Sequence, residues 1–340
     1  MAGVTLRTLA ERAGSSPATV SRALSGHPHV KTSVRVRIEA LAREMGYARS
    51  ALVASVLSQV RSSRTPHYRG TLAILHVPAP GQRALLGPQR RAVAGASQRA
   101  AALGFTLETV RVEPKALPAP ALGRMLAARG VAGVVVMGTH GTEVLAGFPW
   151  ECFAAVTFDY GMTGARQHTA TIDHHWTLTE ALLRLRDMGY RRIGLFLERV
   201  KDERIVYKWS ATFRSFQHQQ GGIGRVPVLF LPRLEPESFH SWRERHRPDL
   251  YLGHCDAVID WLEAKRIRVP RDAGFFSLNH DECSRPCAGL DLRPQSLGAV
   301  AVDALFAQIV RNERGLPETP QVVMFAGRWA DGPTLRTTTK

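Results

Sequence analysis

The sequence predicts a small all-α head followed by an α/β body made of two doubly wound lobes. Residues 4–47 hold three short segments in which apolar side chains recur at helical spacing. From Gly70 onward, apolar strand-like runs alternate with helical patterns, as they do in parallel sheets covered by helices on both faces. About six strand–helix units follow one another. This is more than a single regular sheet usually holds, so we expect two lobes rather than one.

The head has the elements of a helix-turn-helix. Thr5 is placed to cap a first helix whose apolar side chains line one face over residues 6–13. Ser16 and Pro17 then restart a helix, because a capping hydroxyl followed by proline at the first turn is a typical helix start. A third helix is expected over about Ser33–Met45. Two short helices joined by a tight turn present the second one to the major groove of DNA.

Positive charge is concentrated in this head. The 340-residue chain has a formal net charge of +16, and residues 1–65 hold ten Lys and Arg against three Asp and Glu. A charge distribution of this kind favours a polyanion as the partner of the head.

The chain has few features of an exported or membrane-bound protein. Its four cysteines (Cys152, Cys255, Cys283 and Cys287) are too scattered for a disulfide framework, which fits a reducing compartment. The first residues lack the apolar core of a signal peptide, and no apolar run approaches the roughly 18 residues of a membrane span. We therefore expect a cytoplasmic protein that does not enter a membrane.

The elements of the body can be assigned by residue range. Strands are expected at Thr71–Val77, Phe105–Val112, Val131–Met137, Ala154–Phe158, Arg192–Leu197, Val226–Leu231, Leu250–Leu252 and Gly274–Leu278. Helices are expected at Gln89–Leu103, Ala119–Arg129, Trp176–Met188, Ala211–Gln219, Pro236–Arg245 and Asp256–Lys265. Residues 48–69, rich in Ser and Arg, are typical of a linker.

A resemblance to a known family rests mainly on the second helix of the head. The run Ser-Pro-Ala-Thr-Val-Ser-Arg-Ala-Leu at Ser16–Leu24, with Val4-Thr5-Leu6 before it and Gly46-Tyr47 after it, resembles the head of the LacI/GalR family of bacterial repressors. Weaker matches follow in the same order along the body, among them Met188–Gly194. The resemblance implies a sequence-specific DNA-binding transcriptional regulator, a repressor, that binds a near-palindromic operator as a homodimer.

The same resemblance implies how the chain is divided. Residues 1–47 would form the helix-turn-helix domain, and residues 48–69 a hinge. Residues 70–332 would form a periplasmic-binding-protein-like domain that binds a small-molecule effector and dimerises. Its first lobe would comprise about residues 70–159 and 288–315, and its second lobe about residues 163–284 and 318–330.

The resemblance also implies which residues contact DNA. Base edges would be read by Pro17, Ala18 and Arg22, of which Arg22 suits a bidentate contact with guanine. Phosphates would be bound by Thr5, Ser16, Thr19 and Ser21. In the family, a hinge residue wedges into the minor groove, and strict register places Val56 there, with Leu57 one residue further on. Valine is short for unstacking bases, so either Leu57 replaces it or this segment only joins two copies.

Three residues are candidates for binding the effector. Where the family has a sugar-binding arginine and aspartate, this chain has Trp209 and Asn279, and Asp159 ends a first-lobe strand. Trp209 could stack on a sugar ring, and Asn279 could bond hydroxyl groups. Without the arginine, a clamp for carboxylate or phosphate is missing, so we expect a neutral saccharide in a cleft at the strand ends. The alternatives are a core tryptophan, a turn asparagine and a loop-capping aspartate.

Other functions find little support in the sequence. The chain has no Gly-x-Ser-x-Gly hydrolase motif and no phosphate-binding loop, so we do not expect an enzyme. Cys283 and Cys287 match no structural zinc spacing, so neither a metal nor a cofactor is expected. The altered effector positions leave one alternative open, a constitutive DNA-binding regulator whose lobes serve only to dimerise it.

Overall fold

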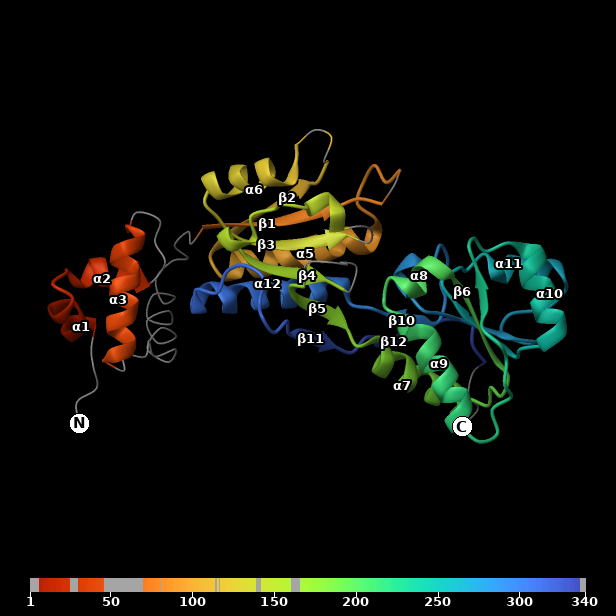
Figure 1. The fold of residues 1–340 in the computed structure, drawn as a ribbon. Helices are drawn as coiled ribbons and strands as arrows, with labels where there is room; N and C mark the ends of the chain where they lie inside the picture. Colours follow the sequence, from red (N-terminus) through yellow and green to blue (C-terminus); the bar gives the residue numbers. More distant parts are fainter. Residues whose placement is uncertain are drawn as a thin grey trace.

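The computed structural model describes residues 6–24, 30–45, 70–79, 81–113, 115, 117–138, 142–159 and 166–336. Figure 1 shows the three-helix head and the two lobes of the body as separate groups of elements. Thr5, Val56 and Leu57 lie outside the described residues, as do the side chains of Pro17, Ala18, Ser21 and Arg22.

The head folds as the sequence predicts. Its helices are α1 (Leu6–Arg12), α2 (Pro17–Leu24) and α3 (Thr32–Glu44). They share a small core in which Leu9, Val20 and Ile38, one residue from each helix, are fully buried. Because these side chains lie at the spacing of one helix face, burying them together holds the three helices in one unit.

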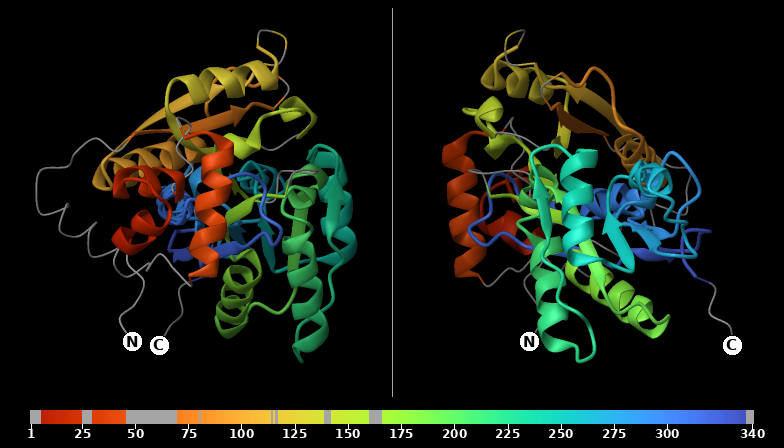
Figure 2. Two further views of the ribbon diagram at one scale, coloured as in Figure 1. Left: turned by 60° about the vertical axis from the view of Figure 1, so that its left-hand side comes forward. Right: turned by 90° about the vertical axis from the view of Figure 1, so that its right-hand side faces the viewer.

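The first sheet is parallel throughout its described pairs. Its strands, in spatial order, are β11 (Val322–Phe325), β5 (His168–Ile172), β4 (Ala154–Phe158), β3 (Val131–Gly138), β1 (Gly70–Val77) and β2 (Phe105–Arg111). Helices α5 (Gly87–Ala102) and α12 (Pro294–Arg311) cover one face, and α6 (Ala119–Ala128) with the short helices η1 (Thr142–Leu145) and η2 (Trp150–Cys152) covers the other. Figures 1 and 2 show the sheet between these two layers.

Helices α5 and α12 cross at very short range. A Cβ atom on Gly298 would lie 1.9 Å from the carbonyl oxygen of Ala92, and one on Gly95 would lie 2.0 Å from that of Gln295. Only glycine leaves room for this backbone approach. The contact joins residues that are some 200 positions apart in the chain, so it anchors α12 to the first lobe.

The second sheet has five parallel strands and one antiparallel edge strand. In spatial order they are β12 (Arg328–Ala330), β10 (Gly289–Asp291), β9 (Gly274–Ser277), β8 (Leu250–Gly253), β6 (Ile193–Glu198) and β7 (Leu229–Leu231), and β12 runs antiparallel to β10. Residues of α7 (His174–Asp187) and α9 (Lys208–Gln219) bury one face, and residues of α10 (Pro236–His246) and α11 (Val258–Ala264) bury the other. Two short helices, α8 (Arg199–Glu203) and η3 (His280–Glu282), follow β6 and β9.

The strand pairing corrects the lobe boundaries expected from the sequence. Strand β5 pairs with β4, and β11 pairs with β5, so residues 168–172 and 322–325 belong to the first lobe. Strand β10 pairs with β9, so residues 289–291 belong to the second. The chain therefore passes between the lobes after β5, after β10 and after β11. These short strands carry too few residues for a period to be read, and only their hydrogen-bond partners place them.

Within the described residues, no helix combines the length and the apolar composition that a membrane span requires.

Candidate functional site

The start of α2 is held by hydroxyl groups. The backbone N–H of Thr19 donates to Ser16 Oγ at 3.1 Å, and the Oγ atoms of the two residues lie 2.9 Å apart. Ser16 is exposed and Thr19 is half-buried, so the two hydroxyl groups retain hydrogen-bonding capacity for a further partner. The sequence predicted this cap, and the cap fixes the start of the helix.

The third helix also braces the first. The guanidinium of Arg37 donates to the carbonyl oxygen of Ala13 at 3.1 Å, just beyond the carboxyl end of α1. A cation at that end satisfies an orphan carbonyl and complements the helix dipole. Arg37 is exposed and at the same time joins α3 to the end of α1.

A second group of polar residues lies where the two lobes meet. His254 follows β8, Asn279 follows β9 and Asp159 follows β4, so each lies at the carboxyl end of a parallel strand. This is the edge at which open α/β sheets bind ligands. We refer to the group as the inter-lobe cluster, consisting of Asp159, His174, Asp202, Trp209, His254, Asn279 and Glu282.

Several buried polar atoms of this cluster have no hydrogen-bond partner among the described residues. They are both ring nitrogens of His254, Nδ1 of His174, Oδ1 of Asn279 and Oδ2 of Asp202. Each such atom costs about 1–3 kcal/mol when it is left unpaired. Because buried polar groups in folded proteins are nearly always paired, this concentration marks a place where a ligand or water completes the bonding.

Other atoms of the same side chains are firmly held. Asn279 Nδ2 donates to Glu282 Oε1 at 3.0 Å, and Lys201 Nζ lies 2.8 Å from Glu282 Oε2. The backbone N–H of Ser210 donates to Asp202 Oδ1 at 3.3 Å. The unpartnered oxygens of Asn279 and Asp202 therefore belong to side chains whose orientation is already set, which is the preorganisation that ligand binding requires.

Both cluster histidines are held in their neutral form. Burial, followed by the charge of Lys201, lowers the pKa of His254 to about 3. Burial also lowers the pKa of His174, against the opposing effect of Asp159. A neutral imidazole offers one donor and one acceptor, and a hydroxyl group can satisfy either.

The three effector residues predicted from the sequence all lie in the cluster, but their roles differ. Asp159 Oδ1 accepts a hydrogen bond from Thr171 Oγ1 at 2.6 Å, and its backbone is left-handed with φ 54°. Asn279 keeps the free oxygen described above. Trp209 is only 2% exposed, so no face is open to stack on a sugar. The structure therefore does not support the predicted stacking of Trp209 on a sugar ring. The indole ring instead makes edge contacts with His174 and His254 at centroid distances of 4.8 and 6.4 Å.

Sequence reasoning missed His174, Asp202 and His254. His254 directly follows a strand that the sequence predicts, so the rule that ligands bind at strand carboxyl ends could have found it. Asp202 lies on α8, a five-residue helix without a readable period. His174 begins α7, and its place in the cluster depends on where the chain passes between the lobes.

One ion pair connects the lobes beside the cluster. Arg91 on α5 lies 2.7 Å from Asp281 on η3, with the two side chains 35% and 19% exposed. Residues of the first and second lobes are thereby joined next to Asn279 and Glu282.

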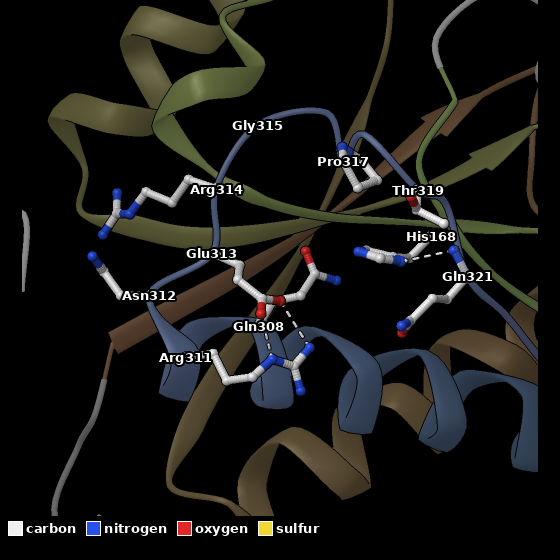
Figure 3. A pocket seen from close by; sticks show the side chains of 10 residues that line it. All are labelled: His168, Gln308, Arg311, Asn312, Glu313, Arg314, Gly315, Pro317, Thr319 and Gln321. Carbon is white, nitrogen blue, oxygen red and sulfur yellow. Dashed lines mark hydrogen bonds and ion pairs between the residues drawn. The ribbon is translucent and has the colours of Figure 1, made fainter. Parts of the chain in front are cut away.

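A well-formed cavity among the described residues lies elsewhere. Its volume is about 530 Å³, and Figure 3 shows its lining at the opposite edge of the first sheet, where β5 and β11 begin. Arg311 is paired with Glu313 at 2.6 Å, and the backbone N–H of Gln321 donates to His168 Nδ1 at 3.0 Å. Since these polar groups already satisfy one another and lie at strand amino ends, we assign the candidate ligand site to the inter-lobe cluster.

A three-helix head followed by two α/β lobes defines the architecture of a bacterial regulator with a periplasmic-binding-protein-like body. Residues 5–50 match the family described as bacterial regulatory proteins, lacI family, and residues 182–331 match the periplasmic binding protein-like domain. The chain belongs to the LacI family.

Individual relatives are distant. The HTH-type transcriptional regulator KdgR of Bacillus subtilis (strain 168) is 22% identical over 209 residues, which cover 57% of this chain and 61% of that protein. The transcriptional regulator CelR–cellobiose complex has a TM-score of 0.58 at 18% identity, covering 97% of this chain and 99% of that one. The Lac repressor dimer bound to operator and the anti-inducer ONPF has a TM-score of 0.55 at 19% identity, covering 98% and 100%. At these identities the solved structures show the shared fold.

Proposed function

We propose that this protein is a cytoplasmic transcriptional repressor that binds a near-palindromic DNA site as a homodimer and responds to a neutral, hydroxyl-rich effector. The effector binds at the inter-lobe cluster. The observation that carries the effector proposal is the set of buried, unpartnered polar atoms on His174, Asp202, His254 and Asn279.

The DNA-binding part is supported by the family and by the geometry of the head. Helix α2 begins at an exposed Ser16, and the head carries an excess of positive charge. One head reads only a few base pairs, so tight specific binding needs two heads on adjacent half-sites. Selection from random duplexes with the full chain is expected to enrich a near-palindrome. A selection that enriches nothing, or light scattering that shows a monomer with full DNA affinity, would contradict it.

The chemistry of the cluster favours hydroxyl groups over anions. Asp202 Oδ2 and Asn279 Oδ1 are acceptors and need donors from the ligand. Lys201, the cation whose charge acts most strongly on His254, is already paired with Glu282 and so is less available to a phosphate. The cellobiose complex of the structurally similar regulator CelR is consistent with this chemistry.

The effector is proposed to change DNA affinity by changing how the lobes are joined. A ligand that bonds to residues of both lobes favours one arrangement of them, and only such differential affinity couples the cluster to the head. The Arg91–Asp281 ion pair also joins the two lobes at this junction, so it contributes to the same equilibrium between arrangements of the lobes.

A thermal-shift panel of neutral, phosphorylated and carboxylated sugars tests the effector proposal, because a ligand that binds only the folded chain raises its melting temperature. A neutral saccharide is expected to stabilise the protein and to alter its DNA affinity. If only charged compounds bind, the proposed effector class is wrong.

The second candidate function is a constitutive regulator whose lobes serve only to dimerise. It is favoured by the burial of Trp209, which leaves no ring face open to a ligand. A complete panel without any shift, together with unchanged DNA binding, would select this alternative.

A further inference from the structure

A group of metal-ligating side chains lies outside the inter-lobe cluster, on the second lobe. Asp256 follows β8, Cys283 follows η3 and Cys287 precedes β10. A carboxylate oxygen of Asp256 and the two Sγ atoms all lie within 4.8 Å of one another. Cys287 is 1% exposed, and the other two side chains are half-buried. The spacing of the two cysteines in the sequence does not by itself indicate a metal site, because the third side chain, that of Asp256, comes from a different loop.

We propose that Asp256, Cys283 and Cys287 bind a thiophilic divalent metal ion of the Zn²⁺ class. Two thiolates and one carboxylate are ligands that Zn²⁺ accepts, and three protein ligands leave a fourth position for water. Ligand atoms around tetrahedral zinc lie roughly 3.3–3.8 Å apart, given bond lengths of about 2.0–2.3 Å. Atoms that are already within 4.8 Å need only small side-chain movements to reach this arrangement.

The surroundings of Asp256 orient its carboxylate and balance its charge. Both the backbone N–H and the Oγ of Ser284 donate to Asp256 Oδ2 at 2.7 Å. Outer contacts of this kind fix the direction of a ligand. Arg285 lies 4.0 Å from the same oxygen and 2.7 Å from Asp260. Three anionic ligands around a divalent ion leave one negative charge, which the Arg285 guanidinium offsets.

The same two cysteines could instead form a disulfide, and the titration with and without Zn²⁺ described below distinguishes the two outcomes. Metal binding takes the proton from each thiol and releases it to solvent, with the cation stabilising the resulting thiolate.

A metal at this place would join two loops of the inter-lobe cluster. Asp256 is two residues after His254, and the loop that ends at Cys283 carries Asn279 and Glu282. Tying the loops together would reduce their freedom before ligand binds, which improves affinity without any new ligand contact. This consequence rests on the proposed effector function, whereas the metal site itself does not.

Titration of the reduced full-length chain tests the site directly. Zn²⁺ is expected to bind with one equivalent per chain by calorimetry, and Co²⁺ is expected to give a thiolate charge-transfer absorption. Cys283→Ser and Cys287→Ser should each lose the absorption and bind Zn²⁺ at least about 10-fold more weakly. The matched controls are Cys152→Ser, on the first lobe, and Cys255→Ser, whose thiol is outside the group. Both controls should bind like the parent chain.

Asp256→Asn keeps the test decisive if a buried cysteine variant does not fold. It should retain the circular dichroism of the parent and bind Zn²⁺ about 10-fold more weakly or worse. Three results would each overturn the site: no stoichiometric binding to the parent, equal binding by the Cys283 and Cys287 variants, or air oxidation to a Cys283–Cys287 disulfide at the same rate with and without Zn²⁺. Because DNA and saccharide are absent from this titration, its failure leaves the proposed function untouched.

Discussion

Replacing His254 by phenylalanine should make the ligand-free protein more stable and unable to respond to its effector. Both ring nitrogens of His254 are buried without a partner in the described part of the chain. Phenylalanine has nearly the same shape and no polar ring atom. His254→Phe therefore removes the free-energy cost of the two unpaired nitrogens while keeping the edge contact with Trp209. Leaving such a group unpaired costs about 1–3 kcal/mol, so the variant should gain stability of that order.

The gain should be visible as a change in melting temperature. About 1 kcal/mol moves the melting temperature of a 150–250-residue domain by roughly 2–4 °C, so a rise of several degrees is expected in the absence of ligand. A saccharide at 100 times its Kd should stabilise the parent by about 2.7 kcal/mol and should add much less to the variant. Differential scanning calorimetry with and without ligand measures both effects.

The matched control is His218→Phe, an exposed position on α9. It should alter neither the ligand-free melting temperature nor the ligand response. If His254→Phe lowers the melting temperature of the free protein, the imidazole has partners that stabilise the fold, and the assignment of the cluster as a ligand site loses its main support.

Three further predictions concern DNA and pH. Arg22→Ala should cost about 1–3 kcal/mol of specific DNA binding and relax the preference at one base pair per half-site, and an unchanged selected-site affinity would show that α2 is not the reading helix. Val56→Leu should tighten binding to sites with a flexible pyrimidine–purine centre while Leu57→Ala is nearly silent, and the reverse ranking in a bending assay would make Leu57 the wedge. Because the folded-state pKa of His254 lies below the ordinary 6.5, protonation favours the unfolded chain, so the free energy of unfolding is unaffected by this group above pH 6.5 and falls as the pH drops toward 3. At pH 5 this loss amounts to about 2 kcal/mol, and His254→Phe should flatten the pH dependence of unfolding correspondingly.

Much of the fold could be predicted because its signals are local. The capping hydroxyl of Ser16, the proline after it and the apolar periods of the head each act within a few residues, and the structure confirms all three helices. The long buried strands, such as β1 and β3, were also predicted nearly to the residue. In these segments the backbone conformation and the burial pattern follow from neighbours in the chain.

The candidate site was predicted only in part. Asp159 could be placed because it ends a recognisable strand and Asn279 through its register in the family resemblance, whereas the burial of Trp209 depends on the packing of α9 against the second sheet. The surroundings of His174 include Asp159 of the other lobe, so they depend on where the chain passes between the lobes, and Asp202 lies on a helix too short for a readable period. No pattern along the chain reports which of their atoms stay without a hydrogen bond.

The sequence by itself determined the head, the alternation of strands and helices, and hence the class of regulator, since these depend on interactions between residues a few positions apart. Only the tertiary structure decided which lobe holds β5, β10 and β11, and it alone brought Asp256 beside Cys283 and Cys287. Strand pairing and side-chain clusters of this kind join residues from distant segments, so their partners are selected by the packing of whole layers rather than by any local period.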